Sequence, residues 1–246
     1  MRYLSKLDLE RLARRVVTAY QKLPNAKLDP RRINPDILLG QMLRLEVDYR
    51  HLSRDRTTLG LTAYDDVGVE VYDSETEDMY FLDGKTVLIE QDLRDAPGKT
   101  GRLNFTKMHE GCHHILNMVF PGEYSGGTNA RKAICYRLPQ AGRKSRNWGE
   151  WQVDNLCSAI LMPEPLLRSN MSLCGLPERI DILNRLYRKD TFSKFEELSN
   201  MMGVSKQALA IRMKSLALLD REYLWTVQTS RCPYGLCQRS SKRALG

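Results

Sequence analysis

Residues 105–119, FTKMHEGCHHILNMV, constrain the fold of this chain more than any other stretch. Apolar residues recur in it at helical spacing, which predicts a helix with one buried face. These residues are Phe105, Met108, Ile115, Leu116 and Val119. Because side chains four residues apart lie one turn apart on the same face of a helix, His109 and His113 point in one direction. Two imidazoles placed in this way can both bind one metal ion.

His109 to His113 match the helical pattern His-Glu-X-X-His, in which two histidines bind zinc and the glutamate acts as a general base. Glu110 follows the first histidine and is angled toward water beside the metal rather than toward the metal itself. A five-residue pattern also arises by chance, and the alternative is that the histidines merely crowd one helix. A third ligand elsewhere in the chain decides between these interpretations.

One class of zinc peptidase has a third histidine ligand six residues after the second histidine. Val119 occupies that position, which excludes this class. A second apolar-periodic helix is predicted at 150–162, with Glu150 and Asp154 on one face. Glu150 can complete a His-His-Glu site, and Asp154 can accept the outward N–H of a ligand histidine and fix its tautomer. The alternative is a solvated acidic face, but apolar neighbours indicate a core helix.

His-Glu-X-X-His, followed 37 residues later by Glu150 on a helix that ends in Ile-Leu-Met-Pro, resembles the ImmA/IrrE family of zinc-dependent metallopeptidases. The resemblance covers about residues 5–220. It implies an α+β fold with a zincin-like core, in which the active-site helices pack with a small antiparallel sheet. It further implies that His109, His113 and Glu150 bind one Zn²⁺ and that Glu110 is the catalytic carboxylate.

The chain departs from the family pattern beside the expected ligands. Cys112 stands directly before the second histidine, where the family commonly has Gly, and Gly111 precedes it. The second helix has Val153 and Leu156-Cys157 where the family usually has Ala and Phe-Ala. These differences alter packing more than ligand chemistry, so they leave the ligand set in place and the substrate preference open.

Three domains are expected: a zincin-like domain at 1–170, a helix-turn-helix-like part at 177–220 and a basic tail at 221–246. The first contains helices at 5–23 and 36–43. An Asp83-Gly84 turn between two apolar runs predicts a hairpin in a small antiparallel sheet over 59–90. Residues 65–78 hold seven acidic residues and no basic one, so they predict an acidic loop or edge. A long loop is expected at 121–149.

The C-terminal region is expected to be helical from Pro177 to about Leu219. Within it, 194–219 shows a helix, a turn at Gly203 and a second helix that Ser205 can cap, which is the helix-turn-helix pattern. Four side chains there could contact nucleic acid: Lys206, Gln207, Arg212 and Lys214. The same pattern also serves as a packing or docking module, so direct DNA binding stays an alternative.

The formal net charge of +8 is confined to the two ends of the chain. Residues 1–32 have nine Lys/Arg and three Asp/Glu, and residues 221–246 have five Lys/Arg and one Asp/Glu. Residues 33–220 therefore carry a formal net charge of −2. This distribution indicates basic arms rather than a basic face on the main domain. The charged first residues contain no apolar run long enough for a signal peptide, so none is expected, and no apolar run reaches the roughly 20 residues of a membrane span. A cytoplasmic protein without a membrane partner is expected.

The remaining candidate residues carry weaker signals. His114 is interpreted as a hydrogen-bonded residue on the helix face, and His51 as a surface residue. The six cysteines are expected to be mostly free thiols, and Cys232 and Cys237 supply too few ligands for a structural zinc site. Tyr124 and Tyr136 in the long loop are candidate oxyanion-stabilising residues.

These features predict a site-specific zinc peptidase in which Glu110 transfers a proton from water to the leaving amine. The resemblance implies that its substrate is a helix-turn-helix transcriptional repressor of a mobile element or stress regulon. The acidic region at 65–78 would then border the site of an extended substrate with basic side chains. The alternatives are a DNA-binding regulator with a structural or sensory zinc, and a partner-binding protein without peptidase activity.

Overall fold

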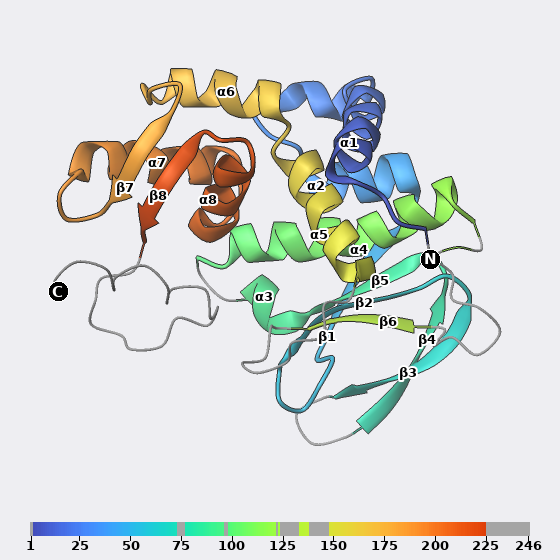
Figure 1. The fold of residues 1–246 in the computed structure, drawn as a ribbon. Coiled ribbons are helices and arrows are strands. Elements are labelled where there is room, and N and C mark those ends of the chain that lie inside the picture. The colour runs from blue at the N-terminus through green and yellow to red at the C-terminus, as the bar shows by residue number, and fades with distance from the viewer. Residues whose placement is uncertain are drawn as a thin grey trace, which may run out of the picture.

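The structure is a computed structural model that describes residues 2–72, 77–95, 98–121, 123, 133–137 and 148–224. It has a mixed α+β fold. Figure 1 shows helix α4 (Thr100–Val119) running through the molecule, with a sheet on one side and helices α1 (Lys6–Tyr20) and α5 (Trp148–Leu161) toward the other. No helix in the described part of the chain is long and apolar enough to cross a membrane.

The main sheet has the strand order β1-β5-β2-β6, with β1 at Glu46–Arg50, β2 at Thr58–Ala63, β5 at Thr86–Glu90 and β6 at Ala133–Arg137. Strand β2 is antiparallel to β5 and β6, whereas β1 is parallel to β5. Strands within the expected range 59–90 do pair antiparallel, but the expectation of a single small antiparallel sheet is wrong. Strands β3 (Asp66–Tyr72) and β4 (Glu77–Asp83) form a separate sheet, and β1, from outside that range, joins the main sheet in parallel. The chain passes through β2, β3 and β4 between β1 and β5, and a connection of that length permits parallel pairing.

The hairpin expected around Asp83-Gly84 is also wrong. The actual hairpin joins β3 (Asp66–Tyr72) to β4 (Glu77–Asp83), in a separate two-stranded sheet. Gly84 does adopt the predicted positive φ, 72°, but its turn connects β4 to β5 in the other sheet. Strand β5 is almost completely buried and lies in the sheet interior, so it pairs on both edges with β1 and β2 instead of with β4.

Both N-terminal helices are present with altered bounds. Helix α1 begins at a capping box, in which the Ser5 side chain accepts from Asp8 N–H while Asp8 accepts from Ser5 N–H. It ends at Tyr20, and a 3₁₀-helix at Pro24–Leu28 follows. The helix expected at 36–43 is a short α2 (Pro35–Ile37) that continues as a π-helical segment, η2 (Leu38–Leu43).

The region between α4 and α5 is not a loop throughout, because it contains strand β6. Helix α4 begins five residues before the predicted helix, and α5 begins two residues before it. A short helix α3 (Gln91–Asp95) links the sheet to α4, and α6 (Glu164–Leu173) follows α5.

The C-terminal part is not wholly helical. Strand β7 (Ile180–Asn184) precedes α7 (Lys189–Met201) and α8 (Lys206–Ser215), and β8 (Leu219–Tyr223) pairs with β7 in parallel. The helix-turn-helix between the strands has the predicted local geometry. Gly203 has a φ of 64°, and Ser205 caps α8 by accepting a hydrogen bond from Ala208 N–H.

One continuous apolar core joins the C-terminal part to the helices around α4. A Cβ at Gly101 in the first turn of α4 would collide with the backbone of Val204 and Ser205, so the two segments touch directly. Asn104 Nδ2 donates to Gly203 O at 2.8 Å. The turn of the helix-turn-helix therefore rests on α4 (Figure 1).

Arg212 of α8 forms an ion pair with Glu10 of α1 and donates from Nε to Met162 O at 3.0 Å. Its side chain is only 4% exposed. The expectation that Arg212 could contact nucleic acid is wrong, because its guanidinium is buried against Glu10 of α1 and the carbonyl group of Met162.

Candidate metal centre

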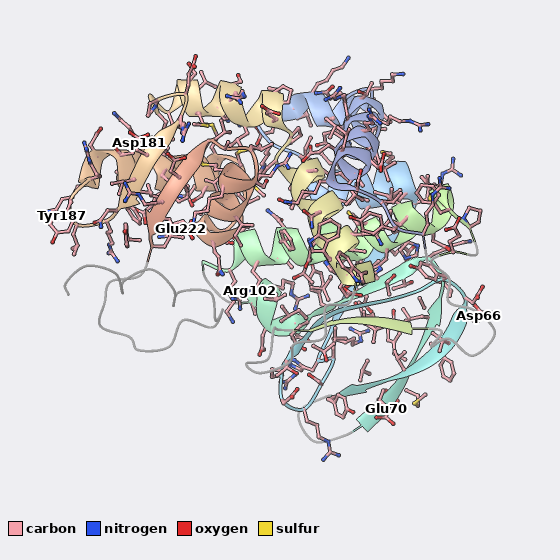
Figure 2. The ribbon with its side chains drawn as sticks, viewed as in Figure 1. Asp66, Glu70, Arg102, Asp181, Tyr187 and Glu222 are labelled. Atoms are coloured by element: carbon pink, nitrogen blue, oxygen red, sulfur yellow. The ribbon has the colours of Figure 1, made fainter. Side chains whose placement is uncertain are left out.

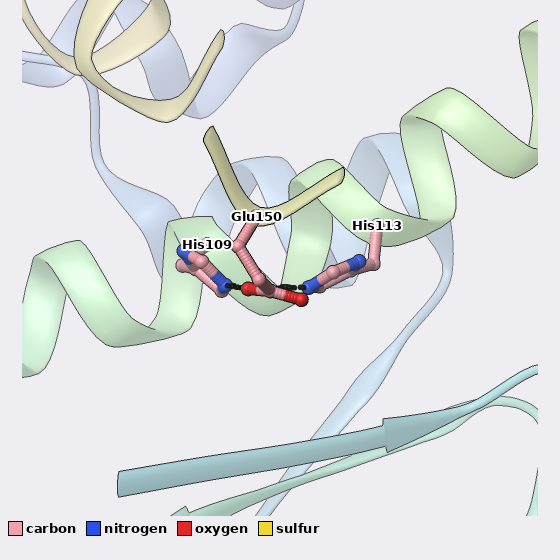
Figure 3. Close-up of side chains that lie close together, drawn as sticks. All are labelled: His109, His113 and Glu150. Atoms are coloured by element: carbon pink, nitrogen blue, oxygen red, sulfur yellow. Dashed lines mark hydrogen bonds and ion pairs between the residues drawn. The ribbon is translucent and has the colours of Figure 1, made fainter. Parts of the chain in front are cut away.

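Three side chains from two helices converge at one point, as Figure 3 shows. His109 and His113 extend from α4, and Glu150 reaches them from the first turn of α5. Their ligand atoms all lie within 4.8 Å of one another. The Nε2 atoms of the two histidines are 3.2 Å apart, and Glu150 Oε2 lies 3.1 Å from His109 Nε2 and 3.8 Å from His113 Nε2.

These separations suit a metal ion. In a tetrahedral zinc site with bonds of ~2.0–2.1 Å, two ligand atoms are about 3.3 Å apart. The three measured distances lie on both sides of that value. The group can hold a metal ion, and two neutral imidazoles with one carboxylate form a donor set that zinc accepts.

Asp154 fixes the orientation of the first histidine. Its Oδ1 lies 3.0 Å from His109 Nδ1, so a proton on Nδ1 leaves Nε2 free to bind a metal. Burial acts to lower the pKa of His109, but the hydrogen bonds to Asp154 and Glu150 and the charge of Glu110 outweigh it and raise this pKa to about 10. Burial and the neighbouring charge of His109 lower the pKa of His113.

Glu110 is the most unusual group at the centre. It is fully buried, and neither carboxylate oxygen has a hydrogen-bond partner in the described part of the chain. Burial raises the pKa of Glu110 to about 8, against the attraction of His109, and the charge of Glu150 acts in the same direction as burial. An unpartnered buried carboxyl group is costly, and its persistence beside donor atoms is typical of a functional site.

Gly60 of β2 makes room for this carboxyl group. A Cβ at Gly60 would collide with Glu110 Oε1, so any larger residue would displace the carboxylate. Strand β2 is paired on both edges and lies directly against α4 at this point. Sequence reasoning missed Gly60, since a single glycine in a strand carries no signal for a contact 50 residues away.

His114 contacts the sheet instead of the metal ligands. Its Nε2 lies 2.6 Å from Thr62 Oγ1, and the Tyr64 ring packs edge-on against it with the ring centroids 5.5 Å apart. Burial lowers the pKa of His114 to about 4, so the ring is neutral at ordinary pH. This geometry agrees with the interpretation of His114 as a hydrogen-bonded residue on the helix face.

His51, expected at the surface, is partly buried and paired with a carboxylate. Its Nδ1 lies 2.7 Å from Oε1 of Glu90, a carboxylate that is almost fully buried at the end of β5. With Asp92 these residues form a second group that could hold a metal ion. Glu90 also accepts from Leu52 N–H at 2.8 Å and pairs with Arg56 at 3.4 Å. These partners satisfy the carboxylate of Glu90, and the Arg56 guanidinium would repel a cation. We therefore assign the cluster a structural role.

The other predicted residues fall into three groups. Lys206 and Lys214 lie on the outer side of α8, but each is in an ion pair, with Glu196 and Glu222 respectively. Cys112, Cys157 and Cys174 are buried free thiols. The remaining predictions concern residues or side chains outside the described part of the chain: Tyr124, Tyr136, Cys232 and Cys237.

No protein-family model matches this chain, and no curated protein matches it. The geometry of the metal centre therefore carries the functional argument.

Proposed function

We propose that this chain is a zinc-dependent peptidase of the His-Glu-X-X-His plus Glu type. The supporting observation is the buried carboxyl group of Glu110, which has no hydrogen-bond partner among the described residues and lies beside three donors at metal-ligand spacing. A purely structural zinc site normally has four protein ligands, whereas this cluster offers three and an adjacent base. That composition favours a catalytic site over a structural one.

His109, His113 and Glu150 would hold the ion, and Asp154 would orient His109. A zinc ion bound there supplies Lewis-acid chemistry, which activates water and polarises a carbonyl group. Glu110 accepts a proton from the water and returns it to the leaving amine. A base with a pKa near neutrality suits both the uptake and the release of this proton. General acid–base catalysis of this kind accelerates a reaction roughly 10²–10⁴-fold.

The proposed substrate is a small helix-turn-helix transcriptional repressor of a mobile element or stress regulon. This part of the proposal rests on the resemblance to the ImmA/IrrE family. Strand β6 is the edge of the main sheet next to β2, so an extended segment of substrate would add there. The acidic residues Asp66 and Glu70 on the outer hairpin, labelled in Figure 2, suit basic side chains of that substrate.

A DNA-binding regulator is less well supported. Of the four side chains that could have met nucleic acid, Arg212 is buried and the two lysines are in ion pairs. Specific DNA recognition needs side chains that reach base edges, and α8 offers Gln207 alone among the predicted four. A partner-binding protein with a sensory zinc is the remaining alternative, and it shares the same metal ligands.

Co-expression with the repressor encoded nearest to the gene, followed by mass spectrometry of the repressor, tests the proposal. One discrete cut that requires zinc and disappears in Glu110→Gln would support a peptidase. Stoichiometric zinc without any cut, under each inducing condition tried, would favour the sensory alternative. Indiscriminate digestion of casein would contradict the proposed specificity.

A further inference from the structure

A pocket of about 270 Å³ lies between the start of α1 and the end of α4. Three arginines line it, together with aromatic and aliphatic side chains. The residues that matter most are Arg2, Tyr3, Arg11, Arg15, Val119 and Phe120. None of them has been assigned to the metal centre, so the pocket is a separate feature of the surface.

The charge of the pocket is positive. Among the described residues, Asp8 is the one acidic residue that lines it, and this carboxylate is already occupied by the Ser5 N–H and hydroxyl groups of the capping box. Arg11 approaches Asp8 only to 3.8 Å. Arg15 makes no hydrogen bond or ion pair with any residue that the structure describes. Among the described residues that line the pocket, guanidinium groups therefore outnumber carboxylates.

The walls of the pocket are physically connected to the metal centre. Phe120 is the C-cap of α4 and follows His113 by seven residues, so its backbone lies about 10 Å along the helix axis from that histidine. The Tyr3 ring packs edge-on against Trp148, which begins α5 two residues before Glu150. The Leu4 N–H donates to Gln152 Oε1 at 2.6 Å and holds this N-terminal segment in place.

We infer that this pocket binds an acidic side chain of the peptide substrate. The inference rests on the proposed function and adds to it a determinant of specificity. An extended peptide advances ~3.3 Å per residue, so a peptide across the metal centre would place a side chain in the pocket about three residues from the scissile bond. Guanidinium groups pair with carboxylates in fixed geometry, and the apolar Val119 and Phe120 would contact the stem of a glutamate.

The test uses two peptides that differ only by Glu or Gln at one position, added to the full-length, zinc-loaded Glu110→Gln protein. Binding is followed through the arginine Nε–Hε signals in NMR spectra. The Glu peptide should bind about fivefold more tightly than the Gln peptide, as expected for a partly exposed ion pair. It should shift the Arg11 and Arg15 signals, and an Arg11→Gln, Arg15→Gln double substitution should abolish the preference.

Arg14→Gln is the matched control, because Arg14 is exposed on the same helix but does not line the pocket. It should retain the preference. Equal binding of both peptides, or a preference that survives the double substitution, would overturn the inference. Since this assay needs no cleavage, an acidic preference together with a wild-type protein that never cuts would contradict the proposed peptidase and leave the pocket assignment intact.

Discussion

At the scale of single residues, the candidate metal centre depends on a few side chains that two helices and one strand bring together. Helical spacing paired His109 with His113 and Glu150 with Asp154, and the family resemblance implied that the two pairs meet. Gly60 could not be predicted in this way, because its importance depends on how closely β2 approaches α4. The same is true of His51, whose partner Glu90 lies 39 residues away on a strand whose pairing was misassigned.

Substitution of the ligands should separate metal binding from chemistry. Glu150→Ala removes one of three donors, so the purified protein should contain far less than one zinc per chain by elemental analysis. Asp154→Asn keeps the ligands but weakens the orientation of His109, and zinc affinity should fall about 10–100-fold. Glu110→Gln should retain full zinc, and loss of zinc in this variant would mean that Glu110 is itself a ligand.

Gly60→Ala should damage the centre without removing a ligand. The added methyl group would collide with Glu110 Oε1, and crowding of this kind costs about 1–3 kcal/mol of the free energy of unfolding. Urea unfolding measures this cost, and zinc content should stay near that of the wild type. Gly40 offers a control, because nothing lies within 4 Å of a Cβ at that position.

Metal binding should release protons and strengthen with pH. The pKa of His109 is raised to about 10 in the metal-free protein, so its ring is protonated at neutral pH and must lose a proton to bind a metal. Zinc affinity should therefore rise roughly tenfold per pH unit below that pKa, as long as the other ligands stay deprotonated. Calorimetry in two buffers of different ionisation enthalpy counts the protons, and a count of zero would contradict the protonated state.

At the scale of elements, the helices were predictable and the strand pairing was not. Helices α1, α4, α5 and α8 follow from periodicity and capping, which are local properties. The turn at Gly84 was also local and correctly placed, but the choice of partner for β5 depends on which strands can cover both edges of a buried strand. Strand β7 was missed because a five-residue strand between two helices carries a weak pattern.

The ion pair between α1 and α8 should stabilise the fold measurably. Glu10→Gln leaves the buried Arg212 guanidinium without its counter-charge, and breaking a buried pair in this way costs about 3 kcal/mol. Glu196→Gln removes an exposed pair with Lys206, and it should change the free energy of unfolding by less than about 1 kcal/mol. Equal effects in urea unfolding would mean that Arg212 is solvated in solution.

At the scale of the whole molecule, the C-terminal part is packed on the helices of the metal centre. The core is continuous, and α8 contacts α1 and α5 through Arg212. A fragment of residues 1–176 should therefore lose cooperative thermal unfolding, because part of its core would be exposed. It should also bind zinc poorly, because α4 and α5 would no longer be held in their relative positions. Circular dichroism during heating tests this, and a sharp transition in the fragment would show an independent unit.

The hydrogen bond from Leu4 N–H to Gln152 links two residues 148 positions apart. During synthesis on the ribosome, the first residues of the chain must wait until α5 has emerged before they reach their final place. His109 and His113 on α4 also lack their third candidate ligand during this time, because Glu150 is made 37 residues after His113. A nascent chain thus has no complete metal centre until more than half of it has left the ribosome, and early intermediates would present two histidines without their carboxylate partner.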